Sequence, residues 1–128
     1  MTSAAIGGFT AGVIGYALDG LSLRHAAIAS NIANANSPAF RPREVAFEAQ
    51  LSALLAQQRT GAGMGASTEH LPPPLVTESL PRAGLTGQRA VEAEIVRLNQ
   101  NVVQYHALIR GLEKHMASLS TAINEGRR

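Results

Sequence analysis

The last third of the chain repeats apolar residues in alternating steps of four and three positions. Because an α-helix has 3.6 residues per turn, this spacing places the repeated residues along one seam. The run has no proline and predicts one helix over 90–125, about 50 Å long at ~1.5 Å per residue. A helix of this length cannot bury its seam against itself, so it needs partner helices. The seam residues are Val91, Ile95, Leu98, Val102, Tyr105, Ile109, Leu112, Met116, Leu119 and Ile123.

A weaker seam of the same kind runs through a predicted N-terminal helix over 12–36. Gly15 and Gly20 each lower helix propensity by roughly 1 kcal/mol, and His25 interrupts the seam. Residues 1–11 contain Gly7 and Gly8, and we expect them to be flexible. The seam residues here are Ile14, Leu18, Leu21, Ile28 and Ile32.

The middle of the chain is less regular. Residues 37–59 predict a turn followed by a short helix from Glu44 to about Arg59, and the glycines and prolines of 60–89 predict a loose insert. The fold class expected for 1–128 is therefore a single elongated all-α domain. Its N- and C-terminal helices would pair antiparallel in the manner of a coiled coil, with the short helix and the insert attached.

Composition excludes several classes of function. The net charge is only +2 and the arginines are scattered, which is not typical of a nucleic-acid-binding protein. The chain has no cysteine, and His106 and His115 are too far apart along a helix to grip one metal ion. Neither a nucleophile elbow nor a phosphate-binding loop is present. We therefore expect no enzyme, no cofactor, no metal site and no small-molecule substrate.

Asparagines cluster where the N-terminal helix should end. Asparagine accepts left-handed backbone and bonds nearby backbone groups, and a residue before proline leaves helical geometry. One interpretation is a helix stop with a defined exit, in which Phe40 is an apolar anchor. Asn99 and Asn101 flank the C-terminal seam, where they either fix the register or belong to a solvated face. The turn residues are Asn31, Asn34, Asn36, Ser37, Pro38 and Phe40.

The string from Asn31 to Phe40 resembles the N-I-A-N-x-x-T-P-x-Y/F signature of bacterial flagellar axial proteins of the rod and hook, with Ser37 in place of Thr. Chain length and further matches resemble the proximal rod (FlgB) family. The similarity covers about 17–55 and 87–126. Where this family usually has Gly-Asn before the C-terminal helix, this chain has Gly87-Gln88. The further matches are Thr68–Leu71, Val91–Glu94, Asn101 and Tyr105.

The resemblance implies a structural subunit of the proximal rod that assembles through its terminal helices and transmits torque. Its implied partners are copies of itself, other rod proteins, the basal-body adaptor protein, the membrane ring and the type III export gate. The implied location is the periplasmic rod of the flagellar basal body, reached without a cleavable signal peptide. Phe9-Thr-Ala-Gly-Val13 resembles the element that docks on that gate. The alternative is a soluble coiled-coil adaptor or chaperone-like binding module unrelated to flagella.

Overall fold

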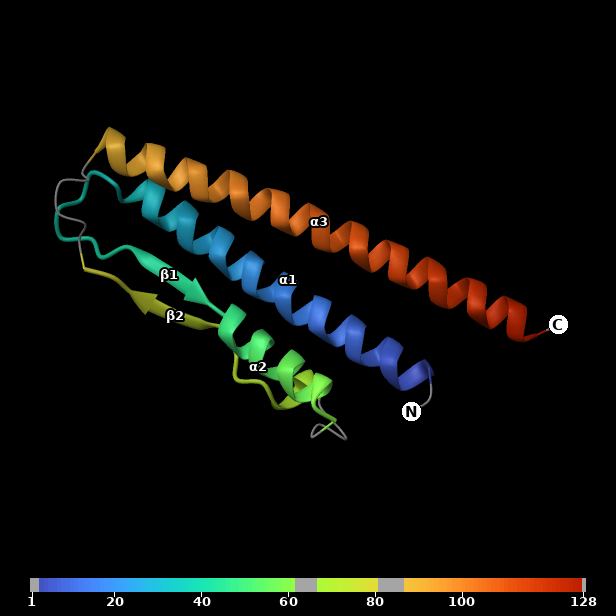
Figure 1. The fold of residues 1–128 in the computed structure, drawn as a ribbon. Helices are drawn as coiled ribbons and strands as arrows, with labels where there is room; N and C mark the ends of the chain where they lie inside the picture. The colour runs from blue at the N-terminus through green and yellow to red at the C-terminus, as the bar shows by residue number, and fades with distance from the viewer. Residues whose placement is uncertain (1–2, 62–66, 81–86, 128) are drawn as a thin grey trace.

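Two long antiparallel helices dominate the computed structural model, which describes residues 3–61, 67–80 and 87–127. They are α1 (Ser3–Ala33) and α3 (Gln88–Gly126), and they lie side by side, with the start of α1 and the end of α3 at the same end of the molecule (Figure 1). The predicted antiparallel pairing of the terminal helices is confirmed. The expectation of a flexible segment over 1–11 is wrong for residues 3–11, which form the first turns of α1.

A small two-stranded sheet makes the all-α expectation only approximate. Strand β1 (Arg43–Ala46) pairs antiparallel with β2 (Leu75–Glu78), so that Arg43 lies opposite Glu78 and Ala46 opposite Leu75. The short helix α2 (Glu48–Arg59) therefore begins later than expected. Residues 44–46 have the local composition of a helix start, but pairing with a distant strand overrides local propensity.

The insert expected over 60–89 is partly ordered. It contains β2 and a single turn of 3₁₀-helix, η1 (Thr68–His70), in which the Glu69 N–H donates to the Ser67 hydroxyl. The expectation of a loose segment is therefore wrong for 68–70 and 75–78. Residues 62–66 and 81–86 of the predicted insert lie outside the described residues.

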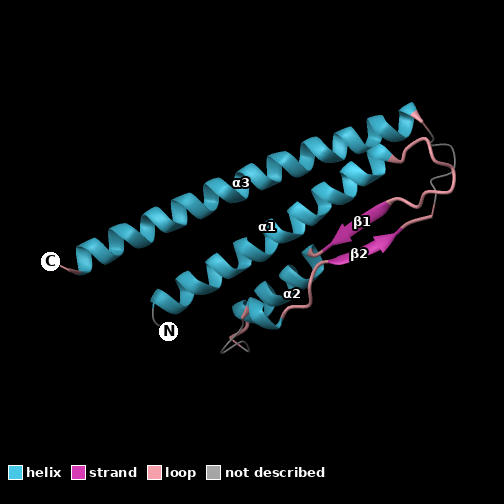
Figure 2. Ribbon diagram, turned by 180° about the vertical axis from the view of Figure 1, so that it is seen from behind, coloured by secondary structure: helices cyan, strands magenta, loops and turns pink. Residues whose placement is uncertain are grey.

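Helix α1 is the middle layer of the molecule. It packs against α3 on one side and against the two-stranded sheet and α2 on the other (Figure 2). Small residues on α1 allow this close approach, and a Cβ atom at Gly20 would overlap the Phe47 ring. The Phe47 ring also meets Tyr16 edge to face, with centroids 6.5 Å apart. The buried cluster between α1 and the segment from β1 to the start of α2 consists of Ala17, Leu21, Ala27, Val45 and Phe47.

Candidate functional site

The outer edge of β1 is sealed by an asparagine side chain from α1. In an antiparallel pair, alternate residues direct their backbone groups toward the partner strand. The Ser79 N–H donates to the Pro42 carbonyl, so the backbone groups of Arg43 face away from β2. There the buried Asn31 amide donates to the Arg43 carbonyl at 3.0 Å and accepts from the Arg43 N–H at 2.8 Å. Asn31 thus takes the place of a neighbouring strand.

Arg24 binds the next backbone carbonyl along the same edge of β1. It lies seven residues before Asn31, on the same face of α1, and its guanidinium donates to the Val45 carbonyl at 2.8 Å. The guanidinium also lies over the Phe47 ring, 4.8 Å from the centroid, and forms an ion pair with Glu48. Partial burial opposes ionisation of Glu48, but hydrogen bonds from Arg24 and from backbone N–H groups hold its pKa below the usual value. Arg24 and Asn31 therefore attach β1 to α1.

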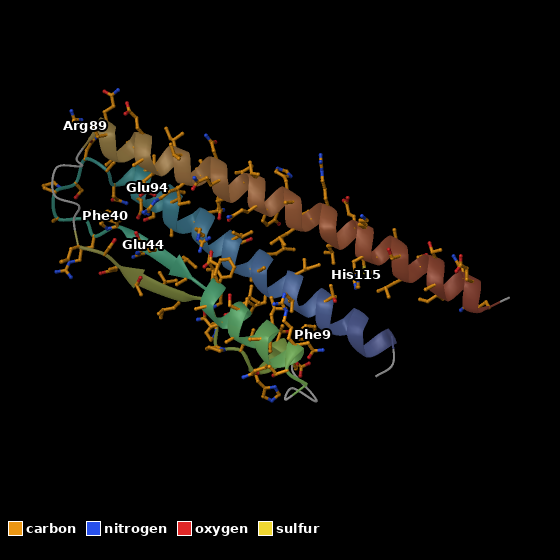
Figure 3. All side chains as sticks on the ribbon, viewed as in Figure 1. Phe9, Phe40, Glu44, Arg89, Glu94 and His115 are labelled. Atoms are coloured by element: carbon orange, nitrogen blue, oxygen red, sulfur yellow. The ribbon has the colours of Figure 1, made fainter. Side chains whose placement is uncertain are left out.

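A buried polar contact links Asn31, and through it the edge of β1, to α3. The Asn31 amide also donates to the Glu94 carboxylate at 3.2 Å, and both side chains are buried. Arg97 lies 3.7 Å from the same carboxylate and pairs with Glu44 of β1 at 3.2 Å. Figure 3 shows Glu94 and Glu44 near the end of the molecule where α1 runs into β1. Because these partners are specific, the contact sets the register between α1 and α3.

A second buried amide lies on the same face of α3, seven residues after Glu94. Asn101 is only 2 % exposed, and its Nδ2 atom donates to the Leu21 carbonyl at 3.0 Å. Its Oδ1 atom has no hydrogen-bond partner among the residues that the structure describes. Of the two asparagines that flank the seam, Asn101 is the one that packs on α1, whereas Asn99 is exposed.

Replacing Asn101 with leucine is expected to raise the free energy of unfolding by about 1 kcal/mol, because an unsatisfied buried acceptor costs roughly 1–3 kcal/mol. The bond to the Leu21 carbonyl is lost, but that carbonyl lies within helix α1. Thermal unfolding followed by circular dichroism measures the change. Asn99→Leu is the control and should leave the midpoint unchanged. A lower midpoint for Asn101→Leu would show that the bond to α1 outweighs the orphaned oxygen.

The predicted C-terminal seam is divided between two environments. Leu98, Leu112 and Leu119 are half-buried, and Leu119 lies beside Gly7 of α1. The polar contacts to α1 come from positions one residue before members of the seam: Glu94 and Asn101 bond to α1, and the His115 ring makes a hydrogen bond of 3.2 Å with the Gly7 carbonyl. Leu108, seven residues after Asn101, packs against the buried cluster that includes Ala17 and Leu21 of α1. The line of α3 that covers α1 is therefore rotated from the predicted seam.

The other half of that seam stays uncovered. Met116 is 55 % exposed and Ile123 58 % exposed, and Ile95, Val102 and Tyr105 are also exposed. Val91 and Ile109 are half-buried. On α1, by contrast, the predicted seam is covered throughout: Leu21 and Ile28 are buried, and the other members, Ile14, Leu18 and Ile32, are half-buried. Helix α3 thus retains a line of exposed apolar side chains.

The turn after α1 contains most of the predicted turn residues. The Asn34 amide donates to the Ser30 carbonyl at 2.8 Å, and the Ser37 N–H donates to the Asn34 carbonyl at 3.0 Å. Asn36 and Pro38 are exposed, and Phe40, which Figure 3 labels, is half-buried. The assignment of Asn31 to the helix stop is wrong, because this residue lies inside α1 and binds β1 and α3.

Three further expectations can be compared with the described residues. Phe9 and Val13, the residues of the export-like element, are half-buried on α1. Within 3–61, 67–80 and 87–127, no three acidic or histidine side chains gather in a way that could hold a metal ion. None of the helices in this part of the chain combines the length and the apolar character needed to cross a membrane.

Sequence reasoning did not identify the polar contact of Asn31 with Glu94, the role of Arg24, or the contact of Gly20 with Phe47. The spacing of seven between Arg24 and Asn31, and again between Glu94 and Asn101, is the signal that could have placed these polar groups on inner helix faces. No protein-family model matches this sequence. No curated protein matches it either.

Proposed function

We propose that this protein is a structural subunit of the proximal rod of the bacterial flagellar basal body, which assembles with copies of itself through α1 and α3. The observation that carries the proposal is the uncovered apolar line of α3, in which Ile95, Val102, Met116 and Ile123 recur along one heptad position. Exposed apolar patches of this kind mark protein interaction sites. A heptad line suits a helical partner in particular.

The place of the signature-like turn supports the same proposal. Asn34, Ser37 and Phe40 lie where the chain leaves α1, and the Gly87 N–H donates to the Ala35 carbonyl at 3.3 Å. The turn thus joins the end of α1 to the start of α3. In a subunit that carries load along its helices, this joint fixes the relative position of the two helices that meet neighbouring subunits.

Partners and location follow from the proposal. Besides copies of itself, the subunit would contact other rod proteins, the basal-body adaptor and the membrane ring in the periplasm. It would reach that place through the type III export gate, with Phe9 and Val13 as the docking element. Both side chains are half-buried against the rest of the fold, so docking through them requires that α1 is at least partly released before export.

An adaptor with a single helical partner is the second candidate, because the same α3 line could serve one partner protein. Deletion of the gene in its source bacterium distinguishes the two. A rod subunit predicts loss of swimming and loss of basal bodies that extend beyond the membrane ring. Normal swimming would contradict the rod proposal and favour the adaptor.

Met116→Glu is expected to abolish swimming when it replaces the wild-type gene. The side chain is already exposed, so the subunit should fold, but a carboxylate buried between subunits costs several kcal/mol without a partner. Ser118→Glu is the matched control, since two residues along a helix place it about 200° away around the axis. Swimming in soft agar and immunoblotting of the exported protein are the measurements. Equal swimming of the two variants would contradict burial of this line.

A further inference from the structure

Helix α3 borders an apolar groove that the chain itself leaves open. The groove runs beside the α1–α3 contact and has a volume of about 350 Å³. Its surface is mainly apolar, although the buried amide of Asn101 also lines it, and the Oδ1 atom of this amide has no partner among the described residues. The other lining residues are Leu21, Ser22 and His25 from α1 and Val102, Tyr105 and His106 from α3.

A convex apolar ridge lies elsewhere on the same helix. It consists of Val96 and Val103, which are 56 % and 68 % exposed and lie one heptad apart, in line along α3. Val102 lines the groove, and Val103 is the next residue, so their side chains point about 100° apart around the helix axis. One neighbouring helix cannot cover both the groove and the ridge.

The α3 residues of the groove and Val103 of the ridge share a segment without formal charge, whereas Val96 lies two residues before it, beside Arg97. From Leu98 to Ile109 the sequence contains no Asp, Glu, Lys or Arg. Contact at Val103 and at the α3 side of the groove therefore removes water mainly from apolar and amide groups, while Arg89 and Arg110 lie one heptad before Val96 and one heptad after Val103.

We propose that the groove between α1 and α3 receives the Val96–Val103 ridge of a second copy of this chain. A groove between two helices accepts β-branched side chains repeated every seven residues from a third helix, and this ridge provides them. Because the concave and convex surfaces differ, the contact is head-to-tail and leaves a free groove and a free ridge on every pair. Such contacts propagate into rings or helical assemblies.

The inference rests on the proposed function only for the choice of a second copy as the occupant, and it names which faces meet. A symmetric dimer would instead bring equivalent surfaces together. The two arrangements therefore differ in which residues of two copies come close to each other.

Cysteine cross-linking tests the contact directly, because the wild-type chain has no cysteine. Val103→Cys on the ridge and Ser22→Cys in the groove are purified separately, one with a mass tag, then mixed and oxidised. The expected result is a mixed disulfide dimer in several-fold excess over either homodimer. Predominance of the Val103→Cys homodimer would overturn the head-to-tail contact. Mixed cross-linking no faster than with exposed Ser118→Cys in place of Ser22→Cys would overturn it as well.

A charge substitution provides the second test. Val103→Glu should weaken self-association in sedimentation experiments by about tenfold or more, since the contact would bury a carboxylate. Its thermal midpoint should match that of the wild type, because the side chain is largely exposed in the subunit. Gln104→Glu, the exposed next residue, is the control and should associate as the wild type does. Equal association of the two variants would overturn the proposal.

The outcomes separate this inference from the proposed function. Mixed cross-linking in a protein whose deletion leaves swimming intact would preserve the contact and contradict the rod. Loss of swimming on deletion, without mixed cross-linking, would preserve the rod and contradict the contact.

Discussion

Asn31→Asp is expected to lower the free energy of unfolding by about 3 kcal/mol, since each buried polar group that loses its partner costs roughly 1–3 kcal/mol. A carboxylate cannot donate, so the bonds to the Arg43 carbonyl and to Glu94 would both be lost. The new charge would also lie beside the buried Glu94 carboxylate. Denaturant unfolding followed by circular dichroism measures the loss.

Asn34→Asp is the matched control for this substitution. The chemical change is the same and the position is only three residues away, but the Asn34 amide bonds within the end of its own helix. Its expected cost is below about 1 kcal/mol, the size of an unfavourable charge near a helix C-terminus. Equal losses for the two variants would contradict the special role assigned to Asn31.

A compensating change sharpens the interpretation. Glu94→Gln removes the second negative charge and provides an N–H that can donate to an aspartate at position 31. The double variant Asn31→Asp with Glu94→Gln should therefore be more stable than the sum of the single changes predicts, by about 1 kcal/mol or more, as expected for residues in direct contact. Strict additivity would show that the two side chains do not interact in solution.

Gly20→Ala is expected to destabilise the protein although alanine is the better helix former. The added methyl group would overlap the Phe47 ring, which is held between Tyr16 and Arg24. Overpacking of a core typically costs about 1–3 kcal/mol, which exceeds the gain of roughly 1 kcal/mol in helix propensity. The free energy of unfolding should therefore fall, and urea denaturation measures the change.

Gly15→Ala is the control from the same helix. Apart from the neighbouring backbone of α1 itself, no atom of the described residues lies within 4 Å of a Cβ built at Gly15, so only the gain in helix propensity remains. This variant should be more stable than the wild type by up to about 1 kcal/mol. If both alanines stabilise the protein, then Phe47 does not pack on α1 at Gly20. If both destabilise it, the loss does not come from this contact.

These two glycines show what local sequence can and cannot predict about stability. Helix propensity treats Gly15 and Gly20 alike, as two weak points in the same helix. The structure separates them, because Phe47, which follows the turn and strand β1 in the chain, packs on Gly20 and not on Gly15. The long helix α3 is the opposite case. Its extent, Gln88–Gly126, follows closely from an apolar repeat and the absence of proline, which are local properties.

The sequence alone determined that two long helices bracket a weaker middle and that their apolar residues share a face. Periodicity shows which residues lie together on a helix, but it does not say which neighbour covers them. The tertiary structure decided that α1 covers one flank of the α3 seam and leaves Ile95, Val102, Met116 and Ile123 open. It also decided that residues 43–46 form a strand rather than a helix, since the partner strand lies at 75–78. Contacts between distant segments settle both choices, and they lie beyond any local pattern.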